Sequence, residues 1–170
     1  IDPAPVPVVL HPYSARSNGL VVWTPKRMEL YTQPSANNTY SQNWEEQLVL
    51  HESRHVGQVE HFTKGVFKPL SLIIGQQSPG IGVALYPSKW FMEGDAVVAE
   101  TELSQSGRGR SASFLSYYRL SFLSGDYRSW NSWRFGSLKY YTPDHYALGY
   151  MLLSTARYKT GNYALAGDIL

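Results

Sequence analysis

The stretch LVLHESRHVGQVEHF at residues 48–62 most constrains the fold. It holds two histidines four residues apart, His51 and His55, and a glutamate directly after the first, Glu52. Residues four apart share one face of an α-helix, so both imidazoles can reach a single metal ion. The apolar LVL before the motif indicates a buried helix, where polar side chains are costly unless they are paired or bind a metal. We therefore expect a zinc site with Glu52 placed to take a proton from water. The alternative is a helix with solvated or hydrogen-bonded histidines.

Composition narrows the class of protein. The chain has 170 residues, of which 43% are hydrophobic and 16% charged, and this predicts one globular domain over 1–170. The net charge is only +2 and the Lys and Arg residues are scattered, so no nucleic-acid partner is indicated. No apolar run approaches the roughly 20 residues of a membrane span. Because the chain has no cysteine, a metal must bind histidine and carboxylate groups.

The two ends of the chain indicate a protein that extends beyond the given sequence. It begins at Ile1 without Met and closes on GNYALAGDIL, without a polar tail. We expect a fragment of a longer protein. The sequence does not indicate an oligomeric state.

The order of predicted elements gives an α+β fold, with a small N-terminal antiparallel sheet followed by a mostly helical part. Strands are expected at about 6–10 and over 19–32, the second broken at Pro25. Segments 64–87, 104–113 and 125–137 are expected to be mostly irregular. The predicted helices and their caps are 44–63 with Asn43, 89–104 with Ser88, 114–123, and 142–161 with Thr142 and a stop at Gly161.

A zinc site of this type needs a third protein ligand, and two residues compete for that place. His61 stands ten residues after His51, the spacing of the metzincin motif HExxHxxGxxH. That motif needs glycine where Gln58 stands, and in a continuous helix His61 would face about 120° away from His55. Glu93, in WFMEGDAVVAE, lies in an apolar stretch of the next predicted helix, where a carboxylate needs a partner.

Two further carboxylates belong to the same predicted helix as Glu93. Glu100 lies seven residues later on nearly the same face, where it can hydrogen-bond a liganding histidine or be ordinarily solvated. Asp95 is expected to point the other way, toward the surface or a loop. A salt bridge from Arg54 to Glu93 is the alternative to a metal.

HESRH followed by WFMEGDA resembles the gluzincin metallopeptidases of the peptidase-MA-like families. In these, HExxH lies on one helix and a third ligand lies in a pattern like W-x-x-E-G-x-A on the next. The resemblance covers about residues 20–161, and HYALGYMLLSTARYKTG is similar to a late Y-A-x-G-Y helix of the family. It implies a zincin-like fold, in which the strand GLVVWTPKRMELYT aligns an extended substrate. It also implies peptide or protein substrates and a secreted, periplasmic or cell-envelope location.

The resemblance also implies a set of site residues. His51, His55 and Glu93 would be the zinc ligands, Glu52 the general base, and Tyr146 the residue that steadies the developing oxyanion. Several gluzincins place a carboxylate four residues after the third ligand. This chain has Val97 there, and Glu100 is the substitute.

Other residues have both a functional and a structural interpretation. Tyr146 and Tyr150 lie one helical turn apart and can face one cleft, where a phenol stabilises negative charge, or they can be ordinary packing residues. Arg108 and Arg110, in SGRGRS, can grip a substrate carboxylate or belong to a solvated loop.

These features predict a zinc-dependent metallopeptidase in which a glutamate general base assists metal-activated water. The alternative is a zincin-fold module that binds peptide or glycan with little catalysis. A zinc hydrolase acting on a non-peptide amide is a third hypothesis.

Overall fold

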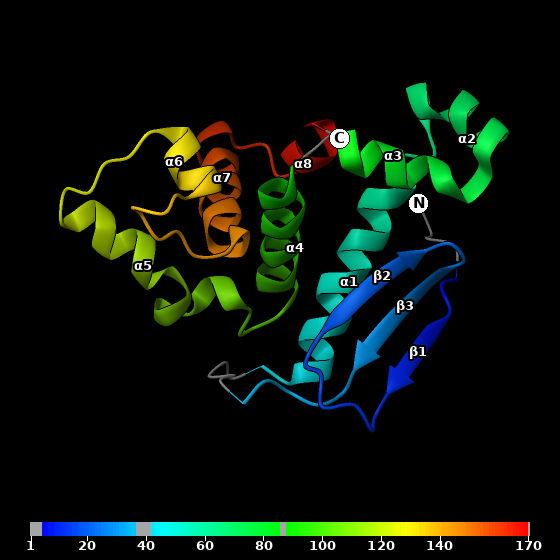
Figure 1. The fold of residues 1–170 in the computed structure, drawn as a ribbon, viewed down its shortest axis with the longest axis horizontal. Helices are drawn as coiled ribbons and strands as arrows, with labels where there is room; N and C mark the ends of the chain where they lie inside the picture. The colour runs from blue at the N-terminus through cyan, green and yellow to red at the C-terminus, as the bar shows by residue number, and fades with distance from the viewer. Residues whose placement is uncertain (1–4, 37–41, 86–87, 170) are drawn as a thin grey trace.

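The computed structural model describes residues 5–36, 42–85 and 88–169 and has an α+β fold, with a small sheet followed by helices (Figure 1). The sheet contains β1 (Val8–His11), β2 (Gly19–Trp23) and β3 (Lys26–Tyr31) in the order β1-β3-β2. β2 and β3 form an antiparallel hairpin, whereas β1 pairs with β3 in parallel. The predicted antiparallel sheet is therefore wrong for β1, because the hairpin folds back and places β3 between the other two strands.

Helix α1 (Trp44–His61) carries the HESRH motif and packs against the sheet. Its start is fixed as predicted, since the Asn43 side chain accepts hydrogen bonds from the amides of Glu45 and Glu46. Alternate residues of β3 face the helix, and together with α1 they form an apolar cluster. The cluster contains Met28, Leu30, Leu48 and Val56.

The rest of the described chain is largely helical. Its elements are η1 (Gly65–Phe67), α2 (Lys68–Ile74), η2 (Gly75–Gln77), α3 (Ser78–Leu85), α4 (Lys89–Leu103), η3 (Arg108–Arg110), α5 (Ala112–Leu123), α6 (Trp130–Phe135), α7 (His145–Thr160) and α8 (Leu165–Ile169). Helices in 65–85 and at α6 replace segments predicted to be mostly irregular. For α3 and α6 the reason is tertiary contacts that periodicity does not show, such as Phe62 with Gly82 and Tyr118 with Trp133. Residues 37–41 lie outside the described residues, as do 86–87 at the end of the segment 64–87.

Two predicted helix caps differ from the structure. α7 begins at His145 with Asp144 as its cap, not Thr142, and the Asp144 side chain accepts from the amide of Tyr146. Ser88 occupies the cap position of α4, but its side chain makes no capping hydrogen bond. The predicted stop of α7 is confirmed, since Gly161 adopts the left-handed conformation.

Helices α4 and α7 touch through their backbones. A Cβ built on Gly149 of α7 would lie 1.8 Å from the carbonyl oxygen of Trp90 in α4, and one built on Gly94 would lie 2.4 Å from the Cα of Gly149. Only glycine permits this approach. The contact fixes the position of α7 relative to the α4 residue Glu93, which directly precedes Gly94.

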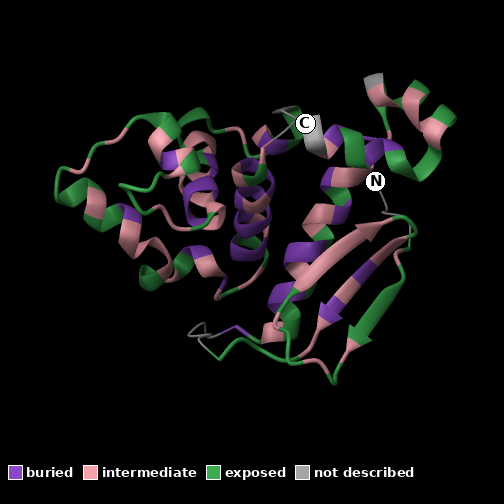
Figure 2. Cartoon of the chain, in the orientation of Figure 1, coloured by how far each residue is buried: buried purple, intermediate pink, exposed green. Residues whose placement is uncertain are grey.

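Two apolar clusters stabilise this helical part. One joins α4 to α7 and α8 and contains Phe91, Met92, Val98, Leu153 and Ala166. The other joins α5, α6 and α7 and contains Tyr118, Trp133, Ala147 and Leu148. In Figures 1 and 2, α1 and α4 lie next to each other, with the sheet beside α1, the later helices beyond α4, and buried residues along both helices.

None of the helices in the described ranges is long and apolar enough to traverse a bilayer.

Candidate metal centre

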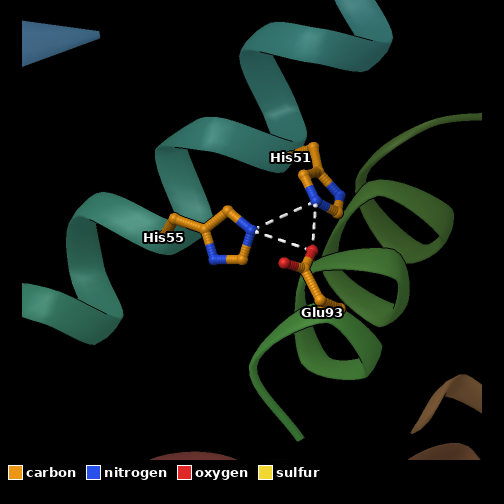
Figure 3. A group of neighbouring side chains, drawn as sticks. All are labelled: His51, His55 and Glu93. Carbon is orange, nitrogen blue, oxygen red and sulfur yellow. Dashed lines mark hydrogen bonds and ion pairs between the residues drawn. The ribbon is translucent and has the colours of Figure 1, made fainter. Parts of the chain in front are cut away.

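Three potential ligand atoms converge between α1 and α4 (Figure 3). The Nε2 atoms of His51 and His55 are 3.1 Å apart. Glu93 Oε2 lies 3.2 Å from the first and 3.3 Å from the second. Helical spacing stacks the two histidines on α1. α4 runs antiparallel beside α1, since His51 meets Glu100 and Gln58 meets Met92, and this places Glu93 opposite the histidines.

The spacing of these atoms fits zinc. A tetrahedral zinc ion bound at about 2.0–2.1 Å needs ligand atoms about 3.3–3.4 Å apart, close to the sides of this triangle. Two imidazoles and a carboxylate are also a donor set that zinc accepts. Burial works against ionisation of Glu93, but hydrogen bonds from His51 and His55 prevail and hold its pKa below the usual range. The carboxylate is therefore ready to bind a cation.

His51 is held from behind by Glu100 and Arg108. Its Nδ1 lies 3.1 Å from Glu100 Oε2 and 2.8 Å from Arg108 Nη2, and the tautomer of the ring decides whether Nδ1 donates to the carboxylate or accepts from the guanidinium. Glu100 is 0% exposed. Arg108 satisfies it by donating from Nε to Oε1 and from Nη2 to Oε2, each at 2.7 Å, while the Arg108 amide donates at 3.1 Å. Although burial opposes it, this pairing lowers the pKa of Glu100, which stays ionised.

His55 is held by a residue that the sequence interpretation missed. Its Nδ1 lies 2.7 Å from Gln58 Oε1, and Gln58 is only 1% exposed. The Gln58 amide then donates to the Met92 carbonyl at 3.0 Å and to Asp95 Oδ2 at 2.7 Å. Gln58 entered the sequence analysis only as a mismatch to the metzincin glycine. Its place three residues after His55, a candidate metal ligand, is the signal in the sequence that could have indicated it.

Asp95 corrects another expectation. It is buried rather than at the surface, and it accepts from Arg54 Nε at 2.6 Å as well as from Gln58. Arg54 thus pairs with Asp95 and not with Glu93, which leaves Glu93 to the histidines. The side chains of α1 and α4 meet through a chain of polar contacts on both sides of the candidate ligands.

Glu52 lies beside the three ligand candidates on the wall of a cavity of about 350 Å³. Gly19, at the start of β2, comes so near that a Cβ there would lie 2.7 Å from Glu52 Oε1. Burial raises the pKa of the Glu52 carboxyl, and the charges of His55 and His51 oppose the rise. A carboxylate with a raised pKa on a cavity wall is suited to accept a proton.

Tyr146, from the first turn of α7, completes the cavity wall. Its ring lies 5.7 Å from the ring of His51, and the Arg108 guanidinium lies 4.9 Å above it. Burial and the nearby charge of Glu93 raise the pKa of its phenol, so it stays protonated and can donate. The close contact of α4 with α7 brings Tyr146 to this place.

The remaining candidates lie elsewhere. His61 is exposed at the end of α1 and does not belong to the group of potential metal ligands in the described residues. Tyr150 packs against Gly109 and Phe114 and does not line the cavity. Arg110 donates to the carbonyls of Thr101 and Ser104, also away from the cavity, whereas Arg108 lines it.

Comparison with known proteins does not classify the chain, because no protein-family model, curated protein or solved structure matches it.

Proposed function

We propose that this protein is a zinc-dependent metallopeptidase with a zincin-like fold of the gluzincin type. The observation that carries the proposal is the triangle of His51 Nε2, His55 Nε2 and Glu93 Oε2, with sides of 3.1, 3.2 and 3.3 Å. Glu52 stands on the wall of the same cavity. A purely structural metal site has no need of a free carboxylate beside an open cavity, whereas hydrolysis does.

Each residue of the site has a separate role in the proposed hydrolysis. His51, His55 and Glu93 hold zinc, which when bound polarises a carbonyl and makes water more acidic. Glu52 takes the proton from the attacking water and returns it to the amine that leaves. Burial supports this role, since it raises the pKa of Glu52 toward that of a useful general base.

Tyr146 is the residue proposed to stabilise the developing oxyanion. Its phenol is held protonated by burial, and its ring is fixed between His51 and Arg108. A donor that is already positioned has little to reorganise when negative charge forms, which is the condition for electrostatic catalysis.

The substrate is proposed to be an extended peptide laid along β2. This strand is at one edge of the sheet, and residues 18–21 line the cavity beside Glu52. An edge strand offers unpaired backbone groups that can pair with a peptide. A peptide paired there would run past the candidate ligands on α1.

The test combines zinc content with hydrolysis of unfolded casein for the wild type, Glu52→Gln and Glu93→Ala, each checked for folding by circular dichroism. We expect one zinc per chain in the wild type and in Glu52→Gln. Glu93→Ala should lose zinc affinity sharply. Turnover in Glu52→Gln should fall by about 100-fold or more, because the water loses its base.

Wild-type turnover in Glu52→Gln, or hydrolysis that a chelator does not affect, would refute the mechanism. Tight peptide binding without any hydrolysis would instead favour a binding module that has kept the site.

A further inference from the structure

Helix α2 is an apolar helix that contributes nothing to the core. Its sequence is KPLSLII, yet none of its residues is buried, and Leu72 and Ile73 are 79% and 81% exposed. In Figure 1 it lies at the outer end of the segment that joins α1 to α4. Figure 2 draws its residues as exposed or intermediate. Apolar helices in proteins are normally covered, so a free one marks an interaction surface.

The charged residues of the chain segment that contains α2 are all of one sign. Between residues 61 and 92 the chain carries three lysines and no Asp or Glu. Lys64 and Lys68 are exposed, and no carboxylate of the described residues pairs with either. The acidic residue that precedes this stretch, Glu60, is paired with Lys26. The lysines therefore lie beside the apolar side chains without an ion-pair partner in the described part of the chain.

Positive charge and exposed apolar side chains occur together on α2. Lys68 and Leu72 are four residues apart and lie on one face, while Ile73 follows directly and is equally exposed. Lys64 precedes η1, the turn that leads into α2. We define Lys64, Lys68, Leu72 and Ile73 as the α2 patch.

We propose that the α2 patch docks this protein on the surface of an anionic lipid bilayer. Leu72 and Ile73 enter the boundary between headgroups and acyl chains, and the two lysines stay among the anionic headgroups. With seven residues α2 is far too short to span a bilayer, so the contact is peripheral.

The composition of the patch favours lipid over a protein partner. Protein interfaces draw most of their energy from Trp, Tyr and Arg, and the patch has none of these. Two exposed aliphatic side chains with two lysines in the preceding turns are what an interfacial membrane contact uses. The proposal does not depend on the metal centre, since none of the patch residues lines its cavity.

The test is sedimentation of the wild-type protein with vesicles of phosphatidylcholine alone and of phosphatidylcholine mixed with phosphatidylglycerol. We expect binding to the anionic vesicles to exceed binding to the neutral ones by about 25-fold, from about five-fold for each lysine. This preference should vanish in about 1 M salt, where charges are screened within about 3 Å. The variant Leu72→Ser/Ile73→Ser should bind at least about ten-fold more weakly, and Lys64→Gln/Lys68→Gln should lose the preference for anionic lipid.

The matched control is Leu120→Ser/Leu123→Ser on α5, where two exposed aliphatic residues, at 63% and 83%, have no part in the patch. It should bind vesicles like the wild type. Failure of the folded wild type to bind anionic vesicles would overturn the proposal, as would equal weakening by the α5 control. Size-exclusion chromatography of the wild type and Leu72→Ser/Ile73→Ser gives a further check. A wild-type dimer that the α2 variant converts to monomer, without lipid binding, would assign the patch to a second copy of the chain and overturn the lipid proposal.

Discussion

Replacing Arg108 by Met tests how the candidate metal centre is supported. Methionine keeps an unbranched chain but removes the two side-chain hydrogen bonds of 2.7 Å to Glu100. Glu100 is 0% exposed, and among the described residues it then keeps only the Arg108 amide at 3.1 Å and His51 Nδ1 at 3.1 Å as partners. Breaking one partner of a buried ion pair costs about 3–5 kcal/mol. We expect the free energy of unfolding to fall by that amount.

The same change should weaken zinc binding. Glu100 Oε2 and Arg108 Nη2 both contact His51 Nδ1, at 3.1 and 2.8 Å, and so fix the orientation of that ring. With Glu100 left partly unsatisfied, the ring loses a firmly placed partner. Loss of such outer partners lowers metal affinity by about 10–100-fold. Stability is measured by urea unfolding of the metal-free protein, followed by tryptophan fluorescence, and zinc affinity by competition with a coloured chelator.

Arg110→Met is the matched control, from the same SGRGRS segment. Its guanidinium donates to two backbone carbonyls at 2.9 and 3.4 Å and reaches no buried carboxylate in the described structure. Its loss should cost about 1 kcal/mol or less and leave zinc affinity unchanged. If Arg108→Met and Arg110→Met behave alike in both measurements, the role assigned to Arg108 is wrong.

Three further variants or conditions test the α4–α7 contact, the effect of bound zinc on stability, and the support of His55. Gly149→Ala should destabilise the protein by about 1–3 kcal/mol or more and lower zinc affinity, because the added methyl meets the Trp90 carbonyl. Gly57→Ala is the control, since a Cβ at this helical position meets nothing within 4 Å. It should be neutral or stabilising when both variants are unfolded in urea. Zinc at about 1,000 times its dissociation constant should raise the melting temperature by about 8–16 °C in calorimetry, from about 4 kcal/mol of binding energy, and an unchanged melting temperature would count against a zinc site. Gln58→Leu should reduce zinc affinity by about 10–100-fold in chelator competition, because the ring of His55 loses its acceptor; an unchanged affinity would mean that Gln58 only fills space.

The sequence predicted the main helix of the site well because its signals are local. The spacing of His51 and His55 and the cap at Asn43 act within one helix, and the structure has both. Glu93 was suggested by apolar surroundings and by resemblance, and the structure brings it to the histidines. Its role as a zinc ligand stays a prediction until the metal is measured.

What the sequence did not reveal depends on contacts between distant segments. The parallel pairing of β1 with β3 depends on the hairpin returning between them, which strand patterns do not encode. The prediction that Asp95 lies at the surface is wrong. Helical spacing alone puts Asp95 opposite Glu93, but the longer side chains of Gln58 and Arg54 on α1 hydrogen-bond to it. Periodicity reports which residues share a face and not which neighbour that face meets.

The seam between α1 and α4 differs in kind from the rest of the interior. The apolar clusters lie to either side of it, whereas the seam itself is joined by directional contacts such as Gln58 with Asp95 and His51 with Glu100. Apolar packing tolerates exchange of one aliphatic residue for another, but a buried polar network specifies one relative position of its helices. The residues that hold the candidate ligands in place therefore also set the alignment of the two helices. We therefore expect aliphatic residues of the clusters to be exchanged one at a time during evolution. Residues of the polar network between α1 and α4 should change only together with their partners.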